Sequence, residues 1–134
     1  MGAESKIIPI EYRELRKWKY QLTHRYNVHT SIIVPENISS DYIYLRKSGI
    51  MTISKHYAWD GATWFPDFKT IIRPSLVHDA FCQLMEEGKL LRDPYRKKAD
   101  KLLKDMCRAE GMSGATSYGV YTAVRSYSKL HYGV

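Results

Sequence analysis

Ser75-Leu76-Val77-His78-Asp79-Ala80-Phe81-Cys82 places an adjacent histidine and aspartate inside an apolar pattern that is typical of a helix. A further acid, Asp100, lies in Ala99-Asp100-Lys101-Leu102-Leu103, which has the same kind of pattern. Ionisable side chains among apolar residues are costly unless they are paired or bind a metal ion. A histidine and two carboxylates on neighbouring apolar helices therefore predict a site, in which a His–Asp general base lies beside a metal-binding acid.

Proline, glycine and capping residues divide the second half of the chain into three expected helices. Pro74 suits a first helical residue and Gly88 a terminator, which predicts a helix over 74–87. The expected N-caps of the second and third helices are Asp93 and Ser113. The third helix is expected to turn these residues inward: Ala115, Tyr118, Tyr121 or Thr122, and Val124.

The short connection between the first two helices predicts that they run antiparallel, which brings Asp100 level with His78. Asp100 would then accept a hydrogen bond from one ring nitrogen of His78 and raise the basicity of the other. Asp79 is rotated by about 100° from His78 around the helix axis and would face the loop 60–63. A carboxylate and the backbone carbonyls of a glycine-containing loop make a hard oxygen site that suits Ca²⁺.

The first half of the chain has the patterns of strands. From Leu15 to Tyr26 apolar or aromatic residues alternate with basic or polar ones, which predicts a half-buried strand. Further strands are expected over 31–34, 42–46 and 50–57, and Lys47-Ser48-Gly49 suits a hairpin turn.

Together these patterns predict an α+β fold with one domain over residues 1–134. A small antiparallel β-sheet over 15–57 would pack on a helical unit over 74–128 that contains two antiparallel helices. Residues 58–73 would form the metal-binding loop between them.

The composition limits the compartment and the partners. No stretch is long and apolar enough for a transmembrane segment, and residues 1–5 do not begin a signal peptide. With two cysteines and no disulfide framework, we expect a protein made in the cytoplasm, or one located in a virion. The net charge of +7 suits an anionic phospholipid surface or another polyanion, although many basic domains carry such charge only for solubility.

These motifs resemble the phospholipase A2 superfamily, and its bacterial and fungal branch most of all. The similar segments are Trp59-Asp60-Gly61-Ala62, the His78–Asp79 helix, and Lys98-Ala99-Asp100-Lys101-Leu102. The final segment, 116–124, is similar to the last helix of that branch. The same histidine helix behind a Trp-Asp-Gly-Ala loop also resembles uncharacterised phage and prophage proteins.

The resemblance implies a calcium-dependent lipid esterase with His78 as the general base and Asp100 as its partner. It implies Ca²⁺ ligands at Asp79, Asp60 and the carbonyl group of Gly61. The same resemblance implies that a tyrosine of the last helix, Tyr118 or Tyr121, hydrogen-bonds the dyad.

The chain departs from the family pattern in two ways. Cys82 stands where the family usually has a tyrosine, three residues after the His-Asp pair, and Ser75 stands where it has a cysteine. The interhelical disulfides of the family are therefore missing. Cys82 and Cys107 are expected about 16 Å apart along the helix axes, too far for a disulfide to replace them.

Two alternatives remain open. The first is a non-catalytic phage or virion protein that keeps the helical scaffold and binds other virion proteins. The second is a metal-dependent HD-type phosphohydrolase, in which His56 would join His78, Asp79 and Asp100. We rank it last because His56 falls in a strand pattern where that family needs a helix.

Overall fold

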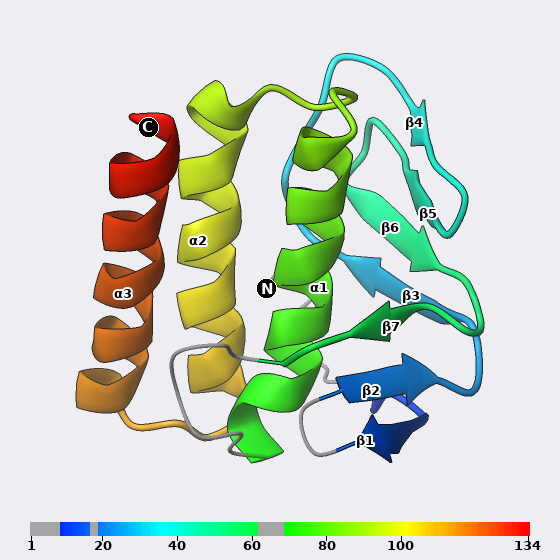
Figure 1. Ribbon diagram of the computed structural model, residues 1–134, viewed down its shortest axis with the longest axis horizontal. Coiled ribbons are helices and arrows are strands. Elements are labelled where there is room, and N and C mark those ends of the chain that lie inside the picture. Colours follow the sequence, from blue (N-terminus) through cyan, green and yellow to red (C-terminus); the bar gives the residue numbers. More distant parts are fainter. Residues whose placement is uncertain (1–8, 17–18, 62–68) are drawn as a thin grey trace. The chain divides into compact units, whose positions relative to one another are not determined.

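A computed structural model describes residues 9–16, 19–61 and 69–134, and the chain divides into two compact units, Met1–Gly61 and Ala62–Val134 (Figure 1). The first unit contains antiparallel strands, and the second contains three helices. The predicted α+β fold class is therefore confirmed. The prediction of a single domain stays a prediction.

The strands of the first unit form two antiparallel sheets, where the sequence predicted one. The three-stranded sheet has the order β1-β2-β7 and consists of β1 (Tyr12–Arg16), β2 (Lys19–Leu22) and β7 (Ala58–Trp59). The four-stranded sheet has the order β3-β6-β5-β4 and consists of β3 (Tyr26–His29), β4 (Ile38–Ser39), β5 (Ile43–Leu45) and β6 (Ile50–Ile53).

The prediction of one strand from Leu15 to Tyr26 is wrong, although its alternation is real. Tyr20, Leu22 and Tyr26 are buried, as the alternating pattern requires. The segment nevertheless contributes to three strands, and β1 pairs with β2 with Arg16 opposite Lys19. A reversal of the chain leaves a period of two intact, so the pattern alone could not locate the break.

The hairpin predicted at residues 47–49 is confirmed. It joins the antiparallel strands β5 and β6, and the amide of Gly49 donates to the carbonyl oxygen of Arg46 at 2.9 Å. Gly49 has a φ of +95°, and a Cβ atom there would lie 3.1 Å from the backbone nitrogen of Ile32. The neighbouring segment 31–34 is not a regular strand, because Ser31 has a φ of 64°, which interrupts an extended backbone.

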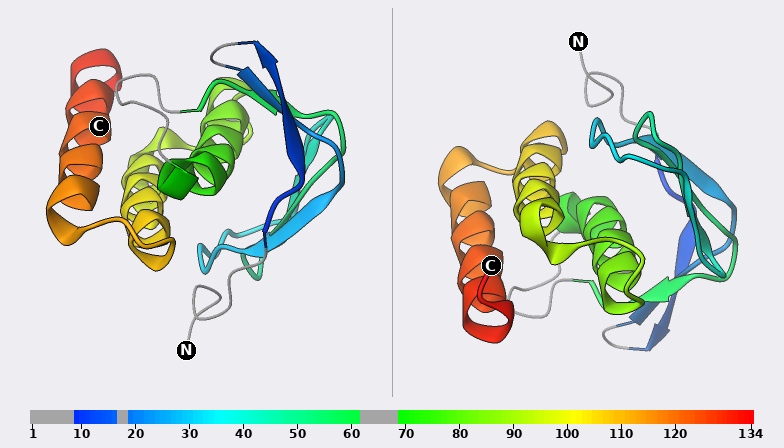
Figure 2. Two further views of the ribbon diagram at one scale, coloured as in Figure 1. Left: turned by 90° about the horizontal axis from the view of Figure 1, so that it is seen from below. Right: turned by 90° about the horizontal axis from the view of Figure 1, so that it is seen from above.

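The helices of the second unit are α1 (Lys69–Glu86), α2 (Arg92–Ala109) and α3 (Gly114–Tyr132). They lie side by side with α2 in the middle, and each runs antiparallel to the next (Figures 1 and 2). The core of this unit includes six buried residues: Ile71, Leu103, Cys107, Met112, Val120 and Val124.

Helix α1 begins earlier than predicted, at Lys69, so Pro74 lies inside it and residues 69–73 are not a loop. Proline has a helical φ and can be accommodated near a helix start, where it removes one backbone donor. Burial of Ile71 and Ile72 favours the additional turn before it. The end of α1 is as predicted: Gly88 has a φ of +73°, and its amide donates to the carbonyl oxygen of Met85 at 3.0 Å.

The predicted N-cap of α3 is confirmed, because the Ser113 hydroxyl accepts a hydrogen bond from the Thr116 amide at 3.1 Å. The predicted inner face is wrong except for Val124. The buried residues of α3 are Ser117, Val120, Val124 and Ser128, whereas Tyr118 is 61% exposed. Two of the four buried residues of α3 are serines, so side-chain size was a poor guide to its buried face.

The second helix begins close to its predicted start. Helix α2 starts at Arg92, and Asp93, the expected N-cap, has an extended backbone with φ −104° and ψ 117°. Regular helical geometry therefore begins after Asp93, close to the predicted boundary.

Two glycine substitutions should have opposite effects on stability. Gly49→Ala should lower the free energy of unfolding by about 1–2 kcal/mol, since alanine is strained at positive φ and would crowd Ile32. Gly119→Ala should raise it by about 0.5–1 kcal/mol, because Gly119 is inside α3 and no described atom lies within 4 Å of an added Cβ. Urea unfolding curves of both variants and the wild type measure the difference, and a stable Gly49→Ala protein would contradict the turn geometry.

Candidate functional site

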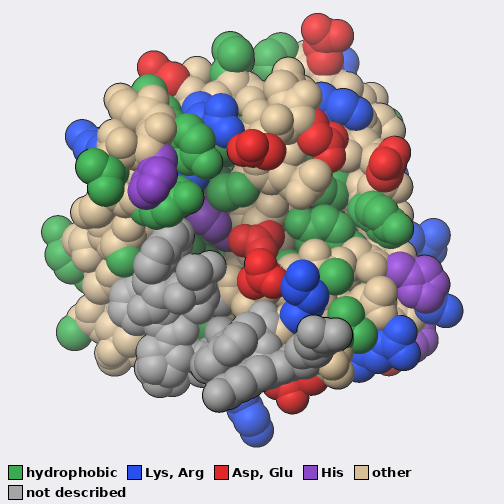
Figure 3. Space-filling view, viewed as in Figure 1, with side chains coloured by type: hydrophobic (Ala, Val, Ile, Leu, Met, Phe, Trp, Pro, Cys, Tyr) green, Lys and Arg blue, Asp and Glu red, His purple; other side chains and the backbone are tan. Residues whose placement is uncertain are grey.

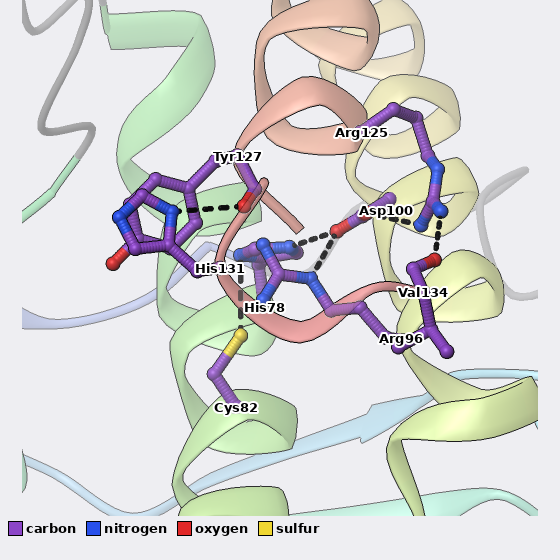
Figure 4. A network of polar contacts seen from close by, with 8 residues as sticks. All are labelled: His78, Cys82, Arg96, Asp100, Arg125, Tyr127, His131 and Val134. Atoms are coloured by element: carbon purple, nitrogen blue, oxygen red, sulfur yellow. Dashed lines mark hydrogen bonds and ion pairs between the residues drawn. The ribbon is translucent and has the colours of Figure 1, made fainter. Parts of the chain in front are cut away.

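The structure brings His78 and Asp100 together, as predicted. His78 on α1 and Asp100 on α2 are joined by a hydrogen bond of 2.6 Å between Nε2 and Oδ1 (Figure 4). The Asp100 side chain is 0% exposed and that of His78 is 9% exposed. The pair therefore lies in the interior of the helical unit, on the antiparallel helices that the short connection indicated.

Two arginines that the sequence reasoning missed also bind the Asp100 carboxylate. Arg96 Nε donates to Oδ1 at 2.9 Å, and the Arg125 guanidinium donates to Oδ2 at 2.8 Å (Figure 4). Burial alone would raise the pKa of Asp100, but the hydrogen bond and charge of His78, together with Arg96, lower it below its ordinary value. Asp100 is therefore a carboxylate with partners on both oxygens.

Aromatic rings of α3 lie beside the Arg96 side chain. The Arg96 guanidinium carbon is 5.9 Å from the ring centroids of both Tyr127 and Tyr132. His131 stacks on Tyr127 with 3.8 Å between ring centroids. Cation–π contacts of this kind hold a guanidinium in place in addition to its ion pair.

The acceptor-only carboxylate determines which nitrogen of His78 carries a proton. Asp100 accepts from Nε2, so Nε2 is protonated and the neutral ring keeps its lone pair on Nδ1. The atom that faces Nδ1 is the sulfur of Cys82, at 3.8 Å, one helical turn further along α1. The spacing of four residues predicts that Cys82 and His78 share one face of the helix, although Cys82 was not predicted as a site residue.

The surroundings of His78 favour its protonated form. Burial by itself would lower the pKa of His78, but the electrostatic interaction with Cys82 and the hydrogen bond with Asp100 outweigh burial and raise it to about 10. At neutral pH the ring is therefore an imidazolium, so it donates hydrogen bonds from both nitrogens.

The two cysteines differ in accessibility. Both are free, as predicted, and Cys107 is fully buried whereas Cys82 is partly exposed. Burial raises the pKa of the Cys107 thiol to about 12, which makes it inert at neutral pH. Of the two thiols, Cys82 is the one that solvent and reagents can reach.

The predicted calcium ligands are divided between the two units. Asp79 is half-buried on α1, while exposed Asp60 and buried Gly61 belong to the first unit, where an Asp60 oxygen lies 3.6 Å from the Lys19 ammonium. Residues 62–68 of the predicted loop lie outside the described residues. Within the described part of the chain no three His, Cys, Asp or Glu side chains form a metal-binding group. Ca²⁺ takes six to eight oxygen ligands, and the described residues of the helical unit offer only Asp79 for the predicted site, so they do not by themselves fit the ion.

The two tyrosines expected near the dyad lie elsewhere on α3. Tyr118 and Tyr121 face each other with 6.5 Å between ring centroids, and Tyr121 lies under the Lys104 ammonium. Tyr118 is two helical turns, about 10 Å, from Arg125, the α3 residue that does reach Asp100. The sequence reasoning chose the helix that contacts Asp100, and the residue of that helix that makes the contact is Arg125.

The histidine that an HD-type phosphohydrolase would need in a helix does not lie in one. His56 is exposed in a turn after β6 with a φ of 81°.

None of the described helices has the length and apolar character needed to cross a bilayer. On the face drawn in Figure 3, acidic side chains are interspersed among the basic ones.

Comparisons of the chain with protein-family models, with curated proteins and with solved structures found no match.

The charge on His78 should make stability depend on pH in a specific way. Its pKa is raised from 6.5 to about 10 in the folded protein, so its contribution is fully present below pH 6.5 and is lost as pH rises to about 10. The loss should be at most about 1.4 kcal/mol per pH unit. The measurement is the difference in unfolding free energy between the wild type and His78→Gln from pH 5 to 10.5. A difference that stays constant across this range would contradict the raised pKa.

Proposed function

We propose that the helical unit is an ester hydrolase of the phospholipase A2 type, in which His78 transfers the proton and Asp100 positions it. One observation carries the proposal: His78 Nε2 lies 2.6 Å from Asp100 Oδ1, which leaves Nδ1 for the reaction. A histidine held in one tautomer by a buried carboxylate is the usual arrangement for a general base.

The residues around the dyad have separate roles in this proposal. Asp100 keeps the proton on Nε2 and orients the ring, while Arg96 and Arg125 hold the carboxylate in place. His78 takes a proton at Nδ1 from the attacking group and returns it to the leaving alcohol. The raised pKa of His78, about 10, means that only a small fraction of the rings is neutral and able to accept a proton at pH 7.

The proposed substrate is the fatty-acyl ester of an anionic phospholipid. The resemblance of the His78 and Asp100 segments to the superfamily supports this class, and the net charge of +7 would attract an anionic surface. Ca²⁺, if bound, would polarise the carbonyl oxygen of the ester; no step above depends on it.

A second candidate function, a non-catalytic phage or virion protein, is favoured by a different observation. Asp100 has three cationic partners, one from each helix, and such a network also serves to hold helices together. In that case the site would be a structural clamp with no turnover.

The wild-type protein should release fatty acid from anionic phospholipid vesicles. His78→Gln should abolish release because it removes the proton-accepting nitrogen. Asp100→Asn should lower the rate roughly 10²- to 10⁴-fold, since it no longer fixes the tautomer. Fatty acid is measured with saturating Ca²⁺ and with chelator, and circular dichroism verifies that each variant is folded.

Asp105→Asn is the matched control, because it makes the same chemical change on α2 at a partly exposed residue that pairs with Lys101. It should retain the wild-type rate. If the folded wild type releases no fatty acid under any of these conditions, the hydrolase proposal is wrong and the non-catalytic one replaces it.

A further inference from the structure

We infer that Cys82 is the nucleophile of this site, so that Cys82, His78 and Asp100 act as a thiol–imidazole–carboxylate triad that forms an acyl-thioester intermediate. The inference rests on the proposed ester hydrolysis and specifies the group that His78 activates. It assigns a side chain of α1, and not a water molecule, as the attacking group.

The first argument is geometric. Cys82 Sγ lies 3.8 Å from His78 Nδ1, and Asp100 Oδ1 lies 2.6 Å from Nε2, so both ring nitrogens have partners on opposite sides of the ring (Figure 4). Because Asp100 keeps the proton on Nε2, Nδ1 of the neutral ring can accept only from the thiol in this arrangement. Nucleophile, base and orienting group are therefore in order along one line of contacts.

The second argument is the balance of charge. The described contacts of Asp100 bring two guanidinium groups and the His78 imidazole to one carboxylate. When His78 is protonated, three cationic groups contact the Asp100 carboxylate in a largely buried cluster, and Arg125 also donates to the Val134 oxygen. A thiolate on Cys82 adds a second negative charge beside the imidazolium, and buried charges persist only when they are paired.

The third argument is accessibility. Cys82 is partly exposed, and its sulfur lies against a ring that is 9% exposed, so this cysteine has access to solvent, which a nucleophile that attacks a substrate requires. Cys107 is fully buried and has no histidine among its described contacts. The chain thus contains one cysteine with the surroundings of a reactive thiol and one with those of a core residue.

The reaction proceeds in two balanced stages. The Cys82 thiol gives its proton to Nδ1, and the thiolate attacks the ester carbonyl carbon; a C–S bond forms, the C–O bond breaks, and the alkoxide takes the proton from Nδ1 to leave as an alcohol. Water then gives a proton to Nδ1 as its oxygen attacks the thioester carbonyl. The C–S bond breaks, the carboxylic acid leaves, and the thiolate–imidazolium pair is restored.

The two nucleophiles predict different intermediates. If His78 activated water, no acyl group would be bound to the protein during turnover. If Cys82 attacks, an acyl-thioester forms on its sulfur before water enters the reaction.

The test uses the full chain and p-nitrophenyl butyrate, an activated ester. Mass spectrometry of tryptic peptides should find a butyryl group on Cys82 and none on Cys107, which is the internal control. Cys82→Ala should lower hydrolysis at least about 100-fold, whereas Cys107→Ala should retain it. In a separate reaction at pH 6, iodoacetamide should modify Cys82 at least about tenfold faster in the wild type than in His78→Gln.

Each failure has its own meaning. Wild-type hydrolysis by Cys82→Ala, or turnover of the wild type with no butyryl group on Cys82, would overturn the inference and leave the hydrolase proposal standing with water as nucleophile. If the wild type hydrolyses no ester, the proposed function fails, and equal alkylation of Cys82 in the wild type and His78→Gln would overturn the inference as well. Butyryl-Cys82 that forms without turnover would support the inference and place the defect in the second stage.

Discussion

The buried carboxylate of Asp100 is the interaction on which the helical unit depends. It is 0% exposed, and it binds His78 from α1, Arg96 from its own helix and Arg125 from α3. Removing one partner from a buried ion pair commonly costs 3–5 kcal/mol, because the remaining charge cannot reach water. One side chain on the central helix therefore sets the register of both outer helices and orients the imidazole of the candidate site.

The features that sequence reasoning predicted correctly are those with local signals. Helical phase and a short connection were enough to pair His78 with Asp100. Glycine at position 49 indicates a turn, and serine at position 113 indicates a helix N-cap. The start of α1 and the division into two sheets depend on burial and on pairing between distant residues. Pro74 was predicted to begin the helix because proline favours the first helical position. Burial of Ile71 favours an earlier start, and the helix begins at Lys69.

The sequence predicted the pairing of His78 with Asp100 but not the other residues of the site. Arg96 lies four residues before Asp100, so helical spacing alone could have predicted its contact. The contact of Arg125 depends on which face of α3 is turned toward α2, and the large aromatic residues of α3 led to the wrong face. Cys82 was also available from spacing. It was not predicted as a site residue because the family pattern has a tyrosine at this position, whereas the thiol itself makes it a candidate nucleophile.

The pairing of β2 with β7 has a consequence for how the first unit assembles. Tyr20 pairs with Trp59, and the chain between them contains the whole four-stranded sheet, whose outermost partners are Tyr26 and Ile53. The entropic cost of closing a loop grows with the length of free chain inside it. Once the four-stranded sheet has formed, only a few unpaired residues on each side connect it to β2 and β7. The pairing of β2 with β7 then closes a short loop of free chain, so its entropic cost is small.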